Sequence, residues 1–309
     1  MVKKYPIEQS ALYKCRSLRR LNALLFLDID SKQIADIKKY YCFEINKKDG
    51  IAKRKITAPT KKLKTVQKRV LYLLQRIERP NWLISGEKGK SYIDNGKAHI
   101  YSNYFLAIDI KSFYDNCNRE YVFRFFKDYL QVSGDIAGIL TDVVTYDNGI
   151  PTGCPTSQLI AYYAYGKMFR EISEIAQKYD CIFTLYVDDM TFSSQEHFDV
   201  NSMKKEIDCT LRKYGHKPKY SKMKYYSRGK DVLITGTVVN RNHELKIPNK
   251  LQKKIYDGFQ NVKDVDIKEM DCNKKKEIAS LRGKLQAAKS IECNKFSDIN
   301  IIVGNIEKQ

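Results

Sequence analysis

The sequence predicts an α+β fold in which an antiparallel sheet carries its helices on one face. The main observation is the order of patterns in the middle of the chain, which runs strand, helix, helix, hairpin, helix, strand. The composition agrees, because 43% of the 309 residues are hydrophobic and 30% are charged, as in folded proteins with a large core. No internal repeat or low-complexity linker interrupts this order.

The first 80 residues are basic and mostly helical in pattern. Residues 18–41 predict two helices. Residues 42–59 predict a strand, a turn at Asp49-Gly50 and a second strand that Pro59 closes. A further helix is expected over 63–78, because its apolar residues recur on one face.

The middle of the chain supplies the sheet. A short apolar run at 104–110 predicts a buried strand, and Asn118 caps the following helix, with Glu120 in its first turn. Residues 157–179 predict one long helix. Its apolar stripe consists of Met168, Phe169, Ile172, Ile175 and Ala176. The remaining elements are two strands over 181–194, a helix over 203–215, a strand pair over 231–248 and Lys-rich helices from Asn249 onward.

The charge of the chain indicates its class of partner. A formal net charge of +20 favours a polyanion, either nucleic acid or an anionic membrane. The 22 Tyr and 13 Phe favour nucleic acid, because rings stack on bases while Lys and Arg neutralise phosphates, although most of these rings are expected in the core. No apolar run of about 18 residues and no apolar signal segment occurs, so we expect a cytoplasmic protein without a membrane partner. The eight cysteines include no CxxC pair and are expected to be reduced thiols.

Three carboxylates stand in similar settings. Asp109 ends the apolar run before it, and Asp188 and Asp189 join the two strands of 181–194. If that hairpin pairs beside the Asp109 strand, the three acids converge, and such a cluster needs cations to stay ionised. Oxygen ligands in small number suit Mg²⁺, and two such ions can activate a hydroxyl and stabilise a leaving pyrophosphate. The alternative is that Asp188 and Asp189 are ordinary turn residues.

The surrounding motifs resemble those of reverse transcriptases. "YVDD" at 186–189 resembles the polymerase signature of that family, and "AIDIKSFYD" at 107–115 resembles its upstream acidic motif. Four further segments are similar in the same order along the chain. They are "RKITAPTKKLKTVQKRVL" (54–71), "GIPTGCPTSQLIAYYA" (149–164), "KYSKMK" (219–224) and "ITGTVVNRNHELKIP" (234–248).

This resemblance implies a right-hand polymerase. Residues 1–100 would form the fingers with the N-terminal helices, and 101–240 the palm with its antiparallel sheet. Residues 117–155 would contribute partly to the fingers. Residues 241–309 would form the primer grip and a small, basic, helical thumb.

The bacterial retron reverse transcriptases fit best. "NGKAHIYSNYFLAID" (95–109) is similar to their Asn…His segment, "ITG" (234–236) to their Val-Thr-Gly motif, and "LYKCRSLRRLNALL" (12–25) to their N-terminal segment. The resemblance implies a cognate structured noncoding RNA as template and primer, with a 2′-hydroxyl as the starting point and branched RNA-linked DNA (msDNA) as the product. It also implies a setting in antiphage defence with a separate effector protein.

The resemblance also implies roles for the acids and their neighbours. Asp109, Asp188 and Asp189, with Ile110, are implied to hold two Mg²⁺ ions. Lys222 is implied to protonate the leaving pyrophosphate as a general acid. A solvated lysine in a Lys-rich loop is the alternative for Lys222.

A nucleotide site is implied beside the acids. Lys53 and Arg54 would bind the triphosphate of the incoming deoxynucleotide, and Tyr114, next to Phe113, would exclude a ribose 2′-hydroxyl. The alternatives are a solvated basic hairpin and ordinary packing at the strand end.

The segment around Gly153 completes the implied nucleotide site. Gly153 would allow close approach of the backbone to the nucleotide, although it can equally shape a turn. Thr152 stands where many family members have Gln, and Gln158 stands where a Pro is frequent.

Contacts with the RNA are implied outside the catalytic motifs. For Asn95 and His99 the alternatives are contact with the RNA and a structural role. The other implied RNA-binding residues are Thr235, Gly236, Lys250, Lys253 and Lys254.

Two other readings of the whole chain remain. One is another compact bacterial reverse transcriptase, from a different defence system or an intron-related lineage. The other is a non-catalytic RNA-binding protein with a relict palm, which the three intact acids disfavour.

Overall fold

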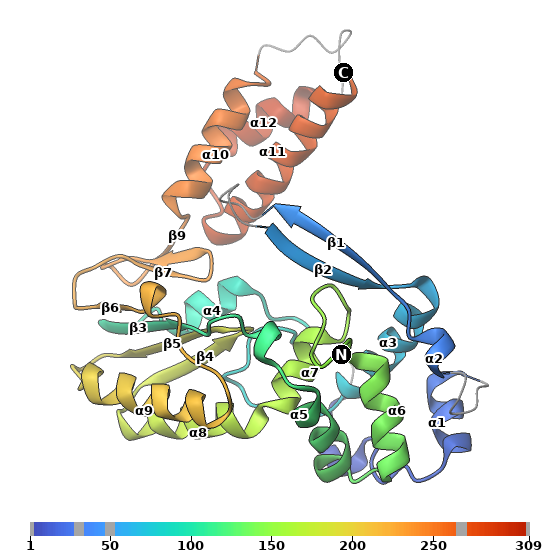
Figure 1. Cartoon of the computed structure of the whole chain (residues 1–309). Helices are drawn as coiled ribbons and strands as arrows, with labels where there is room; N and C mark the ends of the chain where they lie inside the picture. Colours follow the sequence, from blue (N-terminus) through green and yellow to red (C-terminus); the bar gives the residue numbers. More distant parts are fainter. Residues whose placement is uncertain (1–2, 28–33, 47–52, 264–270, 307–309) are drawn as a thin grey trace.

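A four-stranded antiparallel sheet forms the centre of the molecule in a computed structural model that describes residues 3–27, 34–46, 53–263 and 271–306 (Figure 1). Its strand order is β4-β5-β3-β6. The strands are β3 (Tyr104–Asp109), β4 (Ile182–Tyr186), β5 (Asp189–Ser194) and β6 (Lys224–Tyr226). The hairpin β4–β5 therefore pairs beside β3, as the sequence predicts.

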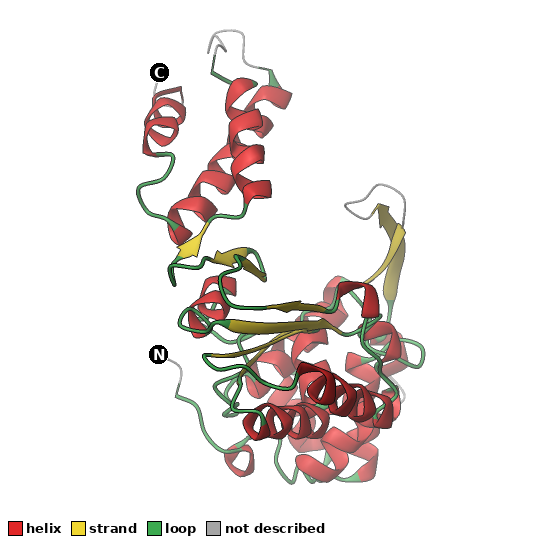
Figure 2. Cartoon of the chain, turned by 90° about the vertical axis from the view of Figure 1, so that its left-hand side faces the viewer, coloured by secondary structure: helices red, strands yellow, loops and turns green. Residues whose placement is uncertain are grey.

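Helices α8 (Gly166–Lys178) and α9 (Val200–Lys213) cover one face of this sheet (Figures 1 and 2). The face that α8 turns to the core includes Met168, Phe169 and Ile172, which follow the predicted apolar stripe. The predicted α+β class, with an antiparallel sheet and helices on one face, is confirmed.

The single helix expected over 157–179 is wrong, because the chain breaks at Tyr165 into α7 (Ser157–Ala164) and α8. The Tyr165 hydroxyl accepts a hydrogen bond from the Asn118 backbone N–H at 2.9 Å and donates one to the Asn116 carbonyl at 3.2 Å. These bonds fix the buried Tyr165 ring against a neighbouring loop. The apolar periodicity continues across the break, so the sequence gives no sign of it.

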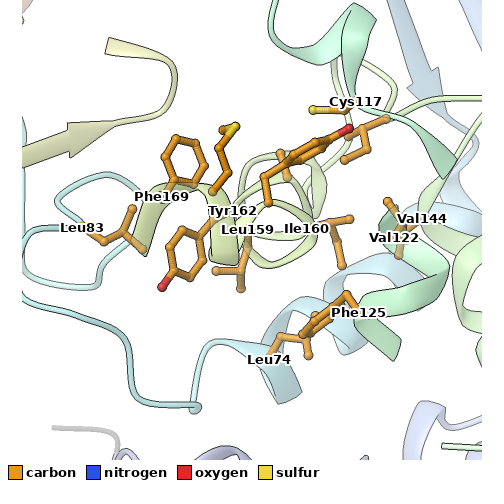
Figure 3. Close-up of a cluster of buried hydrophobic side chains, with 14 of the residues drawn as sticks. Leu74, Leu83, Cys117, Val122, Phe125, Val144, Leu159, Ile160, Tyr162 and Phe169 are labelled. Carbon is orange, nitrogen blue, oxygen red and sulfur yellow. The ribbon is translucent and has the colours of Figure 1, made fainter. Parts of the chain in front are cut away.

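A helical layer packs beside the sheet, and part of its core is shown in Figure 3. In that core Phe125 stacks on Tyr163, with their ring centroids 4.7 Å apart, and Leu74 lies beside Phe125 (Figure 3). The predicted cap at Asn118 is confirmed, because its side chain accepts a hydrogen bond from the Glu120 N–H. The helices of this layer are α1 (Leu18–Leu25), α2 (Ile34–Ile37), α3 (Lys61–Leu74), α5 (Arg119–Arg124) with its π-helical extension η3 (Phe125–Tyr129), and α6 (Gly134–Val144).

A two-stranded hairpin of β1 (Tyr40–Asn46) and β2 (Lys53–Pro59) projects from the helical layer (Figures 1 and 2). The predicted turn at Asp49-Gly50 lies outside the described residues. Helix α4 (Tyr92–Ala98) leads into β3, and a capping box at Ser91 and Asp94 starts it. Short 3₁₀ turns are η1 (Ile7–Gln9), η2 (Tyr114–Asn116) and η4 (Tyr220–Lys222).

The C-terminal part stands apart from the sheet and has its own small core (Figure 1). A three-stranded sheet of β7 (Val232–Ile234), β8 (Thr237–Val239) and β9 (Leu245–Lys246) leads into it. Its helices are α10 (Asn249–Gln260), α11 (Cys272–Ile291) and α12 (Ser297–Ile306). Across the described residues, none of the helices combines the length and apolarity that a membrane crossing requires. All eight cysteines are free thiols.

Candidate active site

Strand pairing brings the three acids to one end of the central sheet. Asp109, the last residue of β3, lies opposite Asp189, the first residue of β5. The backbone N–H of Ile110 donates a hydrogen bond to the carbonyl of Asp188 at 3.0 Å, which holds the β4–β5 turn against the end of β3. Residues far apart in the sequence therefore meet as predicted.

The turn that carries Asp188 has a strained backbone. Val187 has a φ of 61°, in the left-handed region that a β-branched residue rarely adopts and that costs about 1–3 kcal/mol. The Val187 N–H donates a hydrogen bond to the hydroxyl of Ser85 at 2.8 Å. Ser85 is thus a site residue that the sequence reasoning missed.

Ser85 reaches the turn because its own segment runs along the outer edge of β4. The Leu185 N–H donates to the Trp82 carbonyl at 2.9 Å, and the Ile84 N–H donates to the Leu185 carbonyl at 3.0 Å. The segment is too short for a periodic pattern to reveal it, and only the flanking Pro80 and Gly86 mark its ends.

The electrostatics of the acids reflect their crowding. Burial, together with the nearby charges of Asp188 and Asp109, raises the pKa of Asp189 to about 6. The positive charge of Lys222, on η4, opposes this shift, and its ammonium group donates a hydrogen bond to Asp109 Oδ2 at 2.6 Å. That bond in turn raises the pKa of Lys222. The site therefore concentrates negative charge that one lysine only partly balances.

The donor set fits a hard divalent cation. The carboxylates of Asp109, Asp188 and Asp189 and the backbone carbonyl of Ile110 offer oxygen donors at one end of the sheet, the type of donor that suits Mg²⁺. Among the described residues, no group of three acidic, His or Cys side chains stands ready to enclose an ion. This is compatible with Mg²⁺, which takes one or two carboxylates and completes its shell with water and substrate phosphates.

A cavity of about 370 Å³ opens beside the acids. It lies between the central sheet and the β7–β8 turn, in which Thr235 and Gly236 have positive φ values of 42° and 95°. Asp109, Asp189 and Lys222 line one side of it. Sequence reasoning missed Lys224 and Tyr226, which line it from β6.

The segment at Gly153 joins the β1–β2 hairpin to the rest of the chain. The Thr57 N–H donates to the Thr152 carbonyl, and the Thr152 hydroxyl donates to the Lys55 carbonyl, both at 2.8 Å. Gly153 has a φ of 115°, and a Cβ there would lie 3.0 Å from Ile56 Cγ2. The Thr152 hydroxyl is thus engaged with the hairpin backbone.

The other predicted nucleotide-binding residues differ in their exposure. Lys53 is exposed and forms an ion pair with Glu44 at 3.2 Å, and the side chain of Arg54 lies outside the described part of the chain. Tyr114 is half-buried beside Phe113. Phe113 is only 3% exposed and its ring packs on other core rings, so its side chain does not face the solvent.

Asn95 and His99 are both fully buried, so neither is accessible to RNA in this structure. The ring nitrogens of His99 lie 2.6 Å from Ser193 Oγ and 2.7 Å from Thr184 Oγ1, which tie it to both strands of the β4–β5 hairpin. Burial lowers the pKa of His99 to about 3, so the ring is neutral. These contacts favour the structural alternative for both residues.

Asn95 ties helix α4 to the β7–β8 turn. Its side-chain amide donates to Thr235 Oγ1 at 2.8 Å. The adjacent Gly96 allows close packing, because a Cβ there would lie 2.3 Å from Thr237 Oγ1. The remaining predicted RNA-binding residues, on α10, are exposed: Lys250, Lys253 and Lys254.

Comparison with protein families matches residues 45–266 to the reverse transcriptase (RNA-dependent DNA polymerase) family. The chain belongs to this family. It is therefore an RNA-directed DNA polymerase, and the resemblance of its motifs to that family is confirmed.

The curated relatives of this reverse transcriptase include several retron enzymes. It is 26% identical to the retron Ec86 reverse transcriptase of Escherichia coli, over 88% of this chain and 82% of that protein. The retron Ec48 reverse transcriptase of E. coli is 25% identical, over 80% of this chain and 64% of the relative. The retron Ec83 reverse transcriptase of E. coli is 24% identical, over 82% and 83%. These similarities bear out the resemblance to bacterial retron reverse transcriptases.

A solved structure supports the fold of this reverse transcriptase. Apo telomerase from Candida tropicalis, truncated from its C-terminal domain, superposes with a TM-score of 0.51 at 12% identity. The match covers 69% of this chain and 55% of the telomerase chain. The α+β architecture is therefore that of a right-hand polymerase.

Proposed function

We propose that this reverse transcriptase copies a cognate structured RNA into DNA, starting from a 2′-hydroxyl of that RNA, so that the product is branched RNA-linked DNA. The observation that carries the proposal is the pairing of Asp109 with Asp189, next to Asp188 and a cavity under the β7–β8 turn. The similarity to retron enzymes supports the retron type.

The proposed domains follow the expected division. Residues 1–100 form the fingers, 101–240 the palm, and 241–309 the primer grip and thumb, with 117–155 shared between palm and fingers. The grip also uses β7 and β8, because their turn lines the cavity beside the acids. The exposed lysines of α10 (Lys250, Lys253 and Lys254) contact the backbone of an RNA–DNA hybrid.

Asp109, Asp188 and Asp189, with the backbone of Ile110, would hold two Mg²⁺ ions. When bound, these ions neutralise charge on the attacking hydroxyl and the leaving pyrophosphate. Lys222 supplies a proton to the leaving group, since its ammonium group already lies within hydrogen-bonding distance of Asp109. The carboxyl of Asp189 is only partly buried, and burial with the charges of the neighbouring acids raises its pKa to about 6.

The nucleotide enters between the fingers hairpin and the palm. Lys53 and Arg54 bind its triphosphate, and the anchoring of β2 at Thr152 and Gly153 sets the position of that hairpin. Tyr114 lies under the sugar and excludes a ribose 2′-hydroxyl.

The activity is tested with an Asp188→Asn variant. Primer extension on poly(rA)–oligo(dT) with Mg²⁺ is expected to disappear in this variant, while its thermal unfolding stays near that of the wild type. A variant that remains active and Mg²⁺-dependent would remove Asp188 from the site.

The RNA partner is tested by sequencing nucleic acid that co-purifies with the protein. A single small RNA joined to DNA of fixed length supports the retron type. Heterogeneous or untemplated DNA supports another compact bacterial reverse transcriptase. Protection of cells against phage that depends on Asp188 and on a neighbouring effector gene tests the role in antiphage defence.

A further inference from the structure

Aromatic and arginine side chains alternate along the outer face of helix α3 and beyond its C-terminal end. Their order in space is Tyr5, Arg76, Tyr72, Arg69 and Phe26, a set that we name the aromatic–arginine ladder. Arg69 Cζ lies 4.2 Å from the ring centroid of Phe26 and 5.0 Å from that of Tyr72. Arg76 Cζ lies 5.3 Å from the Tyr5 centroid and 6.0 Å from the Tyr72 centroid.

Helical spacing explains why these side chains share one face. Arg69 and Tyr72 are three residues apart on the side of α3 that faces away from the core, and Arg76 follows in the turn just after the helix ends. The opposite side of the helix is buried and includes Leu63, Val66, Val70, Leu73 and Leu74. The apolar face of α3 is therefore buried in the protein core.

Phe26 extends the ladder at a backbone cost. It ends helix α1 with a φ of 56°, a left-handed conformation that is unfavourable for a bulky residue, yet its ring is 76% exposed. Arg69 Nε donates a hydrogen bond to the Leu24 carbonyl at 2.7 Å, which fixes the guanidinium under the ring. Tyr72, which lies between Arg69 and Arg76, is also 46% exposed.

The surroundings of the ladder are strongly basic. Residues 61–76 contain no Asp or Glu. In the part of the chain that the structure describes, no carboxylate forms an ion pair with Arg69 or Arg76, and Arg76 Nε is buried without a hydrogen-bond partner. The exposed lysines of the same helix are Lys61, Lys62, Lys64 and Lys68.

This combination matches unpaired RNA better than a membrane. Open aromatic faces stack on bases that are not already stacked in a duplex, while Arg and Lys contact the phosphates. Insertion into a lipid surface requires an exposed apolar helix face, and that face of α3 is buried in the core. Helices α1 and α3 lie at the right of Figure 1, away from strands β3 to β5, which carry the acids and lie at the left.

We propose that the aromatic–arginine ladder is a second RNA-binding site, which takes a single-stranded loop of the RNA partner outside the catalytic cavity. The proposal rests on the proposed function only for the identity of that RNA. The exposed rings of Phe26 and Tyr72 contact unpaired bases, and Arg69 and Arg76 hold the flanking phosphates.

The test measures binding of two fluorescein-labelled RNAs to the full chain. One is a stem closed by a single-stranded loop of mixed sequence, and the other is the same stem as a blunt duplex. Phe26→Ala combined with Tyr72→Ala is expected to weaken binding of the loop RNA by at least about tenfold and to leave duplex binding within about twofold. Equal affinity of the variant and the wild type for the loop RNA would overturn the proposal.

Two control variants separate stacking from charge. Lys62→Ala with Lys64→Ala is expected to weaken both RNAs to the same small extent, because it removes only charge from the same helix. Arg69→Lys keeps the charge but loses the planar group, and it is expected to weaken the loop RNA selectively. Selective loss of loop binding in the lysine variant but not in the ring variant would also contradict the proposal.

Measurements of DNA synthesis and of vesicle binding separate the loop-binding site from the catalytic function and from a lipid site. DNA synthesis on poly(rA)–oligo(dT) is expected to be unchanged in the ring variant, and failure of the wild type in this assay would count against the proposed function without affecting the loop measurement. Binding to phosphatidylglycerol vesicles that the ring variant loses, with loop RNA binding intact, would show a lipid site and overturn the proposal.

Discussion

The ammonium group of Lys222 lies 2.6 Å from Asp109 Oδ2 and forms an ion pair with it. In the sequence, Asp109 precedes the β4–β5 hairpin and Lys222 follows it. The pair connects η4 to the end of β3, and the Lys219 N–H donates to the Asp109 carbonyl at 2.7 Å beside it. The position of Lys222 is therefore fixed with respect to the other acids.

We predict that Lys222→Met lowers the rate of nucleotide addition at saturating nucleotide by about 10²-fold or more, because the leaving pyrophosphate loses its proton donor. Lys222→Arg keeps the ion pair but holds its proton more tightly, so it is expected to recover only part of the rate. Single-turnover extension measures both. A rate for Lys222→Met that equals the wild type would make this residue a solvated lysine.

Ser85→Ala is expected to reduce DNA synthesis without unfolding the protein. The substitution removes the hydroxyl that accepts the Val187 N–H, which costs about 1–3 kcal/mol if that donor is left unpaired and loosens the strained turn next to Asp188. Primer extension and thermal unfolding are measured together. Ser85→Thr keeps a hydroxyl and is the control, and equal loss of activity in both variants would argue against the hydrogen bond.

Gly153→Ala is expected to weaken the contacts that hold the β1–β2 hairpin against the segment of Thr152 and Gly153. The new Cβ would lie 3.0 Å from Ile56 Cγ2 and 3.2 Å from the Thr57 carbonyl oxygen, in a residue whose φ is 115°. We expect the KM for the deoxynucleotide to rise and the free energy of unfolding to fall by about 1–3 kcal/mol. Gly89→Ala is a matched control, because Gly89 has a φ of 88° but has no atom within 4 Å of the added Cβ.

His99 predicts a dependence of stability on pH. Its pKa falls from 6.5 to about 3 on folding, so below pH 6.5 the unfolded chain takes up a proton that the folded protein does not. Stability from this residue is present in full above pH 6.5, and it is lost as the pH falls toward 3. We expect His99 to account for a loss of about 2 kcal/mol between pH 7 and pH 5.

The measurement is urea unfolding of the wild type and His99→Gln at both pH values. His216, whose pKa is lowered to about 4, titrates in both proteins and cancels in the comparison. The variant is expected to be less stable at pH 7, because it leaves buried hydroxyls of Ser193 and Thr184 with poorer partners. An identical pH slope in the two proteins would contradict the buried, neutral state of His99.

Tyr114→Ala is expected to admit ribonucleotides. The buried Phe113 fixes the backbone beside Tyr114, which follows Asp109 by one short turn, so loss of the Tyr114 ring opens space without moving the acids. Tyr114→Phe retains the ring and should retain sugar selectivity. The ratio of ribonucleotide to deoxynucleotide incorporation measures the effect, and an unchanged ratio in Tyr114→Ala would assign the ring to packing.

The sequence predicts those parts of the site that depend on periodic elements. The strands of Asp109 and Asp189 are short apolar runs with an acid at the end, so their pairing and the convergence of the acids could be expected. The role of Ser85 could not, because four residues along a strand edge have no period of their own. The break at Tyr165 was hidden for a different reason, since it depends on hydrogen bonds to residues near 117.

Buried polar residues were the other source of error. Asn95 and His99 form a pattern that suggests contact with RNA, but their partners Thr235, Thr184 and Ser193 are distant in sequence and show no motif. Likewise, Arg69 and Tyr72 look like an ordinary solvated helix face until Phe26 of α1 is placed above them.

Helix α4 lies between two parts of the candidate site, the β4–β5 hairpin and the β7–β8 turn. His99, just after the helix, forms hydrogen bonds to both strands of the β4–β5 hairpin. Within the helix, Asn95 donates a hydrogen bond to Thr235 of the β7–β8 turn, and Gly96 packs closely against Thr237 at the start of β8. One seven-residue helix and the residue that follows it therefore connect the hairpin that carries Asp188 and Asp189 to the β7–β8 turn above the cavity. We expect a displacement of α4 to move this hairpin and this turn together.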